Sequence, residues 1–379
     1  MTFRKTLAAA AAALCASAAG AASVTAYGIV DTYVAVYNNG DKTSVFEGSG
    51  AKAGSRYGFK GTEELGNGTS AFFQLENGFY SDSGTNTGGP GSWAFQRLAV
   101  LGLKNDTWGT LSAGRQYSLN FTQIAKFDPF GVTMGSVIGN YMAPVSFASR
   151  PGISGMAGAD NFIRRDNSIQ YSTPSLGGFT LTVQASLGEQ TAGDGEASST
   201  LGNSYAVQGV YRNGPLAAGL TVSMQNMSVL YNQYNRRADN VTANAGVSYD
   251  FGITKLYGNF IYKHGDGNRE YKDAATPYNP NLYIGAIQAK TPLFGGSLNT
   301  GAAYLKNDSA SQADSWNVQV RYDYPLSRRT TVYAGAGYLS NEDKAQYDIG
   351  PGGGGTASPA TAAGGDDVWI AYVGLNVTF

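Results

Sequence analysis

The chain ends with the stretch VWIAYVGLNVTF, residues Val368 to Phe379. Its apolar residues alternate with small or polar ones. One face of a β-strand would carry Trp369, Ala371, Val373, Leu375, Val377 and Phe379, and the other would carry Tyr372, Gly374, Asn376 and Thr378. Because successive side chains of a strand point to opposite faces, one face can contact hydrocarbon while the other contacts water. About ten such residues, tilted, cross a bilayer. The stretch indicates a lipid-facing strand, although soluble antiparallel sheets also alternate.

The N-terminus has the order of a secretory signal peptide. Arg4 and Lys5 precede the apolar run 7–14 and the small residues 19–21, and this charged, hydrophobic and small-residue sequence is typical of such a peptide. We therefore expect residues 1–21 to be removed and residues 22–379 to form one barrel domain. Cys15 is the only cysteine and lies inside the peptide, so the mature chain has no thiol for a disulfide or a zinc–cysteine site.

Composition favours a membrane barrel over an enzyme core. Charged residues make up 14% of the chain, with 52 Gly and 25 Tyr, whereas ordinary globular domains have about 25% charged residues. Beyond the signal peptide no run approaches the ~20 apolar residues of a membrane helix, but a barrel hides its hydrophobicity in alternation. Removing Arg4 and Lys5 from the 26 basic residues leaves 24 against 27 acidic ones, a net charge of −3. This balance does not suggest a nucleic-acid partner, because such proteins usually carry a basic stripe.

Short and long connections alternate along the chain. Short turn signals occur at 65–68, 106–109, 174–178, 213–215, 250–252, 292–296 and 325–329. Longer polar connections occur at 39–53, 81–91, 118–163, 188–202, 227–239, 265–280, 307–313 and 341–365. Seven short and eight long connections predict an all-β, sixteen-stranded antiparallel transmembrane barrel with short periplasmic turns and long external loops. A soluble Greek-key sandwich gives no reason for this regular asymmetry.

The third long connection, residues 118–163, is unusual in both length and composition. It far exceeds the usual four to six residues or so and carries Phe121, Ile124, Phe127, Phe130 and Tyr141. A solvated loop has no need of these side chains. We expect this loop to fold against the inside of the wall and to narrow the wide lumen that sixteen strands enclose.

Several motifs resemble the general trimeric porins of Gram-negative bacteria, and the neisserial and burkholderial branch in particular. They are SVTAYGIVD from Ser23, SRYGFKGTEELG from Ser55, GRQY from Gly114 and the terminal Phe379. The resemblance covers the whole chain. It implies a homotrimer in the outer membrane, in contact with its lipid, whose third loop folds inward. It also implies a water-filled channel for passive diffusion of ions and small hydrophilic solutes, with no cofactor.

The resemblance also implies a constriction in which basic wall residues face acidic residues of the third loop. On its motifs the wall residues correspond to Arg56, Arg115 and Arg164, with Arg165 beside Arg164 as the competitor. Asp128 matches the acidic position at the loop tip.

Strand parity refines these candidates. Arg56 shares the lumenal face with Lys60, since Tyr57 and Phe59 take the other face. Arg115 has the parity of the outward-facing Leu111 and Ala113, so it reaches the lumen only if the strand bends.

Arg97 has the parity of Leu101 and Leu103, and is a weaker candidate for the same reason. The loop tip offers Asp128, followed mainly by neutral residues up to Asp160. This imbalance between wall and loop leads to the hypothesis that the channel has a weak preference for anions.

Other functions require features that the sequence does not supply. A barrel enzyme of the lipase or protease kind would have to use His264, the single histidine, which stands beside a Gly-Asp-Gly-Asn loop. Acidic spots such as residues 266–268 lack the spacing of a metal site, so we expect neither catalysis nor a metal. A substrate-selective channel and a structural adhesion barrel remain open, and conductance measurements distinguish them from a general pore.

Overall fold

The computed structural model describes residues 23–87, 95–141, 162–188, 202–231, 234–266, 281–308, 311–350 and 363–379. The signal peptide expected at 1–21 and most of the loop segments at 188–202 and 265–280 lie outside these residues. The described strands are β1 (Ser23–Asn38), β2 (Thr43–Ser49), β3 (Arg56–Gly66), β4 (Thr69–Gly78), β5 (Leu98–Asn105), β6 (Gly109–Tyr117), β7 (Arg164–Ser172), β8 (Phe179–Ser186), β9 (Ser204–Asn213), β10 (Leu216–Tyr231), β11 (Tyr234–Asp250), β12 (Lys255–Asp266), β13 (Leu282–Leu293), β14 (Gly296–Asn307), β15 (Ser315–Pro325), β16 (Thr330–Asn341) and β17 (Val368–Thr378).

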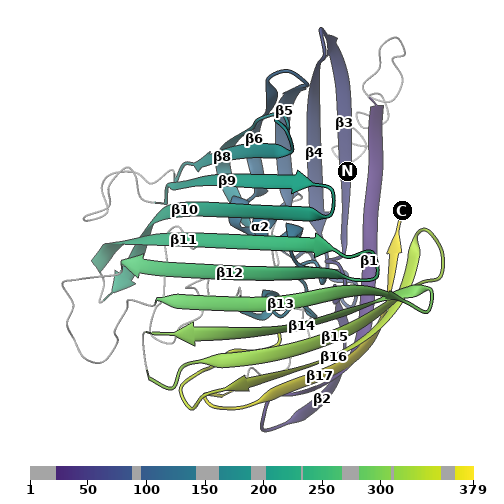
Figure 1. Ribbon diagram of the computed structural model, residues 1–379, viewed down its shortest axis with the longest axis vertical. Coiled ribbons are helices and arrows are strands. Elements are labelled where there is room, and N and C mark those ends of the chain that lie inside the picture. Colours follow the sequence, from purple (N-terminus) through teal and green to yellow (C-terminus); the bar gives the residue numbers. More distant parts are fainter. Residues whose placement is uncertain are drawn as a thin grey trace, which may run out of the picture.

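These strands form one closed antiparallel sheet (Figure 1). The first strand, β1, pairs with β17 on one side, and on the other side it pairs with β3 over its first half and with β2 over its second half. Therefore β2 and β3 together make one strand of the wall, interrupted at residues 50–55. The prediction of a sixteen-stranded barrel is confirmed. The expectation that residues 39–53 form only a loop is wrong, because β2 continues the wall within them.

Alternation holds in the last strand as the sequence predicts. The side chains of Trp369, Val373 and Leu375 are 39%, 53% and 41% exposed, whereas Ile370 and Tyr372 are 1% and 5% exposed. On the inner face, the ring of Tyr372 packs over Gly335 of β16 and occupies the space that a side chain there would need. The outer face is thus apolar and open to lipid, and the inner face is packed or polar.

All seven predicted short turns join adjacent strands at one end of the barrel. Figure 1 shows the β9–β10 and β11–β12 turns at the right-hand ends of these strands. The expectation of a long connection at 227–239 is wrong. The strands β10 and β11 pair up to Tyr231 and Tyr234, so at that position a hairpin extends beyond the neighbouring strands.

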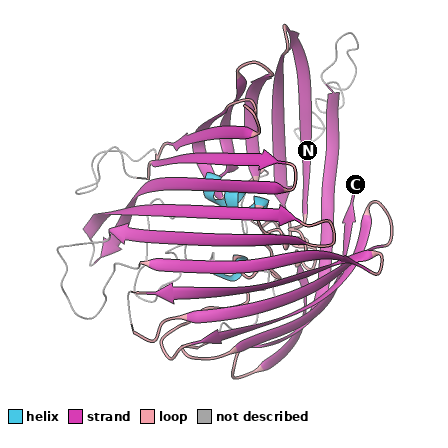
Figure 2. Ribbon diagram, in the orientation of Figure 1, coloured by secondary structure: helices cyan, strands magenta, loops and turns pink. Residues whose placement is uncertain are grey.

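The third loop lies inside the barrel, as expected. It begins with α2 (Leu119–Lys126), whose N-cap Ser118 accepts a hydrogen bond from the backbone N–H of Phe121 at 3.1 Å. The helix contacts β9, β10 and β11, and a 3₁₀ turn, η1 (Gly139–Tyr141), follows. Figure 2 shows these helical segments within the ring of strands. No helix in the described part of the chain is long and apolar enough to cross a membrane.

Candidate functional site

One half of the inner wall holds the third loop through side-chain amides of β9, β11, β12 and β15. The amide nitrogens donate to loop carbonyl oxygens as follows: Gln208 to Leu119 at 3.0 Å, Asn244 to Asn120 at 3.2 Å, Asn259 to Phe127 at 2.8 Å and Asn317 to Val137 at 3.0 Å. Buried carbonyl groups need such donors, because water does not reach them. The amides therefore fix the course of the loop without adding net charge to the lumen.

The same half of the wall receives the apolar side chains of the loop. Phe127, Ile124 and Ile138 are fully buried. The ring of Phe127 lies directly on the backbone of β11, where a Cβ at Gly246 would come within 2.4 Å of the ring. Only glycine leaves room for this contact. The position of the loop therefore depends on glycine at position 246.

The opposite half, from β3 to β7, faces a cavity of about 670 Å³. Three arginines line it: Arg56 at the start of β3, Arg97 just before β5 and Arg164 at the start of β7. Across from them, α2 contributes Lys126. Among the described lining residues four are basic and none is acidic. The space between loop and wall is therefore strongly electropositive.

A single buried carboxylate organises two of the arginines from behind. The Oε1 of Glu76 lies 2.6 Å from Nε of Arg97 and 3.8 Å from the Arg56 guanidinium. Its Oε2 accepts a hydrogen bond from the Tyr27 hydroxyl at 3.0 Å, and Tyr27 in turn accepts one from Gln74 at 2.7 Å. Because Glu76 is 3% exposed, it positions the guanidinium groups from behind and does not contact a passing ion, although its charge offsets part of theirs.

An aromatic pair connects the arginines to the loop. The Tyr117 hydroxyl accepts a hydrogen bond from Arg97 at 3.1 Å, and the Arg164 guanidinium lies 5.1 Å from the centre of the Tyr117 ring. The same ring stacks on Phe121 of α2 at 4.9 Å. Guanidinium groups favour the face of an aromatic ring, so Tyr117 limits how far the arginines and the helix can separate.

Three of the basic residues expected at the constriction do not line this cavity. Arg115 pairs with the exposed Asp166 and donates to the Gln96 carbonyl, beside a bulge in β6. Arg165 is buried, and Lys60 lies over the Tyr27 ring at 5.5 Å, further toward the short turns. None of the three lines the 670 Å³ cavity.

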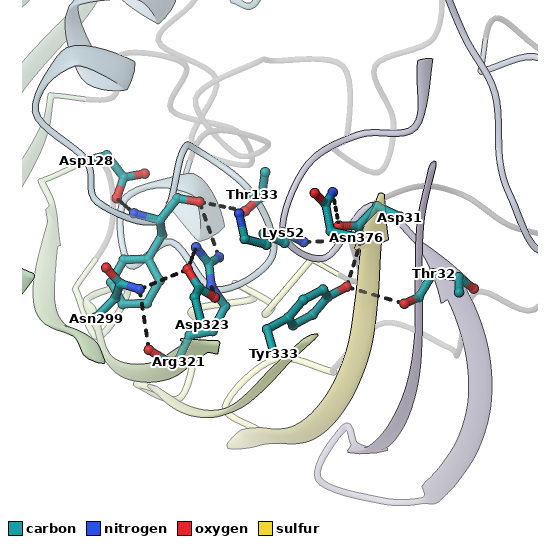
Figure 3. A network of polar contacts seen from close by, with 11 residues as sticks. Asp31, Thr32, Lys52, Asp128, Thr133, Asn299, Arg321, Asp323, Tyr333 and Asn376 are labelled. Carbon is teal, nitrogen blue, oxygen red and sulfur yellow. Dashed lines mark hydrogen bonds and ion pairs between the residues drawn. The ribbon is translucent and has the colours of Figure 1, made fainter. Parts of the chain in front are cut away.

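Asp128, expected to face the arginines, is turned into its own loop. Its carboxylate accepts hydrogen bonds from the backbone N–H groups of Phe130 at 2.9 Å and Val132 at 2.6 Å. Burial raises the pKa of this carboxyl above its usual value, although those hydrogen bonds oppose the rise. The nearby guanidinium of Arg321, on β15, donates to the Phe130 carbonyl oxygen at 3.3 Å (Figure 3). Asp128 therefore closes a loop turn and does not line the cavity, and Asp160 lies outside the described residues.

A polar network supports the interrupted strand next to this loop tip. Asp31 of β1, fully buried, accepts hydrogen bonds from the Tyr333 hydroxyl at 2.7 Å, from Asn376 at 2.8 Å and from the backbone N–H of Lys52 at 3.4 Å (Figure 3). Lys52 belongs to the break between β2 and β3. The wall thus keeps its bend at residues 50–55 because β1, β16 and β17 all contribute to one buried carboxylate.

Lys126 differs from the arginines in its surroundings. Its ammonium donates to Oε1 of Gln208 at 2.8 Å, which is a neutral acceptor. Burial, with a smaller contribution from the positive charge of Arg212, lowers the pKa of Lys126 to about 8. Lys126 is therefore the cation of the cavity whose charge changes nearest to physiological pH.

His264, the residue that a catalytic function would require, lies in β12. Its Nδ1 is 2.7 Å from Oδ1 of Asn281. In the described part of the chain no three His, Cys, Asp or Glu side chains gather as metal ligands would.

Sequence reasoning missed Glu76, Tyr117 and Lys126. Strand parity could have found Glu76, since it stands two residues from Gln74 on the same face of β4. Lys126 directly precedes the Phe127–Asp128 motif, but no pattern in the sequence marks it as a residue that lines the lumen. Its position is set by a helix that forms inside the barrel. Arg97, the weaker candidate, lines the cavity although it has the parity of Leu101 and Leu103, because it precedes β5, where strand parity does not apply.

Comparisons with known proteins agree with this geometry. The family model described as Gram-negative porin matches residues 6–344. An outer membrane porin protein of Bordetella pertussis is 33% identical, over 90% of this chain and 97% of its own length. Outer membrane porin protein 32 of Delftia acidovorans is 32% identical, over 86% and 88%.

Among solved structures, an anion-selective porin from Comamonas acidovorans superposes with a TM-score of 0.79 at 25% identity, over 94% of this chain and all of that one. The sequence relatives, the barrel and the lumenal loop lead to one assignment. The chain belongs to the Gram-negative porin family, and it forms an outer-membrane channel for the passive diffusion of ions and small hydrophilic solutes.

Proposed function

We propose that the channel prefers anions and that its constriction consists of Arg56, Arg97, Arg164 and Lys126. The observation that carries the proposal is the cavity between loop and wall, whose described lining has four basic residues and no acidic one. Arginine stays protonated at every relevant pH. In a narrow, partly desolvated passage such charges attract anions and repel cations. The similar Comamonas acidovorans porin is described as anion-selective.

The remaining site candidates have secondary roles in this proposal. Arg165 and Lys60 contribute to the positive potential of the lumen from outside the cavity. Arg115 and Asp128 act on structure, through an ion pair and a loop turn. Glu76 and Tyr117 are positioning residues for the arginines.

We further infer that residues 1–21 are a cleaved signal peptide, that the mature barrel begins at residue 22 and that it assembles as a homotrimer. Support comes from the resemblance to general trimeric porins and from the charged, apolar and small-residue order of the N-terminus. The relatives are porins, and this favours a channel over an enzyme.

The zero-current potential of refolded protein in a planar bilayer, under a KCl gradient, tests the proposal. We expect the sign that corresponds to chloride permeation, and conductance steps in groups of three. The variant Arg56→Glu, which reverses one lining charge, is expected to shift the potential toward potassium. Arg328→Glu, which makes the same charge reversal in the exposed β15–β16 turn, is the control for a charge change far from the cavity. A wild-type potential of the opposite sign would reject anion preference.

A further inference from the structure

A second cavity lies below the arginine wall, at the short-turn end of the barrel. Its volume is about 430 Å³. It is formed where β7, β8 and β9 meet their turns, and its lining includes Lys126, Arg212, Gln170, Gln208, Ser172 and Thr182. Among the described lining residues two are basic and none is acidic. This space has the charge of the constriction but a different chemical lining, rich in hydroxyl and amide groups.

The two cavities meet at the loop helix. Thr122 and Lys126 line both of them. Lys126 therefore lies between Arg56, Arg97 and Arg164 in the first cavity and Arg212, near the turn that ends β9, in the second.

Lys126 and Arg212 are available to a ligand in a way that Arg97 is not. Neither forms an ion pair with a carboxylate of the described residues. Gln208, the neutral partner of Lys126 at 2.8 Å, is held in place because its own nitrogen donates to the Leu119 carbonyl and the Thr221 hydroxyl, each at 3.0 Å. The ammonium is thus oriented without being neutralised.

The neutral groups of the lining add hydrogen-bonding capacity. Ser172 and Thr182 are 2.9 Å apart and share a hydrogen bond. Oε1 of Gln170 accepts from Gln184 at 3.1 Å, so the amide nitrogen of Gln170 is left as a donor. Several oriented donors around two cations suit a tetrahedral or planar oxyanion better than a bare halide, because an oxyanion has many acceptor sites.

We propose that Lys126 and Arg212 form a second, periplasmic anion subsite that binds oxyanions such as inorganic phosphate after they pass the arginine wall. The inference rests on the proposed anion preference and extends it. It makes the channel a two-step path, in which the first step selects for negative charge and the second for oxygen acceptors. Chloride uses both steps but gains little from the second.

Phosphate conductance of single channels, measured at pH 7 against phosphate concentration, tests this subsite. We expect saturation in the wild type. Arg212→Gln is expected to raise the half-saturating concentration by about threefold or more, because one of two facing charges is lost at close range. Arg212→Lys is expected to restore most of the affinity. Arg328→Gln, an exposed turn variant with the same charge change, is expected to match the wild type. In chloride, which gains less from the subsite, the loss of conductance in Arg212→Gln is expected to be clearly smaller than the loss in phosphate.

The outcomes separate the subsite from the constriction. If Arg212→Gln matches Arg328→Gln in phosphate while Arg56→Gln weakens chloride preference, the second subsite is wrong and the proposed function stands. If the wild type prefers cations, both proposals are wrong. Equal losses of phosphate and chloride conductance in Arg212→Gln would show a general field effect and would also overturn an oxyanion subsite.

Discussion

The two halves of the lumenal wall have the same strand geometry but different roles. From β9 to β15 the inward-facing polar residues are mainly Asn and Gln, and their nitrogens bind the backbone of the third loop. From β3 to β7 the corresponding positions hold Arg56, Arg97 and Arg164, which face an open cavity. A neutral amide can satisfy a carbonyl group without adding a charge. Arg321 of β15 also donates to a loop carbonyl, that of Phe130 at 3.3 Å, but its charge is paired with Asp323 at 2.8 Å. The comparison shows that the inner face of the barrel is divided into an anchoring half and an ion-facing half.

The strongest test of the ion-facing half concerns its buried carboxylate. Arg97→Ala leaves Glu76 without its partner at 2.6 Å. Loss of one member of a buried ion pair costs about 3 kcal/mol or more, and we expect that decrease in the free energy of unfolding by urea in detergent. Arg56→Ala removes a contact at 3.8 Å and is expected to cost about 1 kcal/mol or less.

A double variant provides the control for this comparison. Arg97→Ala with Glu76→Gln removes both charges of the close pair and is expected to recover part of the lost stability, since no carboxylate remains buried alone. Recovery is incomplete because Arg56 also loses its contact with Glu76 at 3.8 Å. Equal destabilisation by Arg97→Ala and Arg56→Ala would mean that Glu76 does not distinguish the two arginines.

The anchoring half is tested by filling the space under Phe127. In Gly246→Leu the new side chain must displace a ring that would lie 2.4 Å from its Cβ. Overpacking of this kind costs about 1–3 kcal/mol, and here the loop can yield by leaving the wall. We expect a lower free energy of unfolding and a changed single-channel conductance, since the loop narrows the lumen.

The matched control for that variant is Gly285→Leu in β13, where an added Cβ meets no atom within 4 Å. We expect the control to keep the wild-type conductance. A Gly246→Leu channel with unaltered conductance would indicate that Phe127 does not hold the loop.

A smaller effect is expected from pH, through Lys126, which lies on the loop helix across from the arginines. Burial lowers the pKa of Lys126 to about 8, so its charge is present below pH 8 and is lost above it. Anion preference in the zero-current potential should therefore decline between pH 7 and pH 9, while the arginines keep their charge. Lys126→Arg is expected to remove this decline. A decline that persists in Lys126→Arg would assign it to another group.

The sequence predicts the wall better than the lumen. Alternation in residues 368–379 and the regular turns follow from the two-residue period of a strand, which is local in sequence. The break between β2 and β3 has no such local signal. It depends on Asp31, Tyr333 and Asn376, which come together only when the barrel closes.

Strand parity predicts which face of the wall a site residue takes, but only for residues inside a strand. Arg56 lies inside a strand and takes the expected lumenal face, whereas Arg97 precedes β5 and lines the cavity despite the parity of Leu101. A family motif identified Asp128 as a charged residue of the loop, but no pattern in the sequence tells whether its carboxylate meets backbone N–H groups or an ion. That choice is made by the turn at residues 128–131.

The smallest effect is expected for a substitution at Asp128. It tests whether this carboxylate belongs to the loop turn or to the ion path. If its carboxylate serves the loop turn, Asp128→Asn keeps an oxygen acceptor for one of the two N–H groups, at 2.9 Å or 2.6 Å, and removes a charge that the lumen does not face. We expect a modest loss of stability, about 1 kcal/mol, and a zero-current potential within error of the wild type. The Arg56→Gln variant, measured beside it, is expected to shift that potential although it also changes the net charge by one. A shift in Asp128→Asn as large as that in Arg56→Gln, toward stronger anion preference, would place the carboxylate in the ion path and end the division between an anchoring loop and an ion-facing wall.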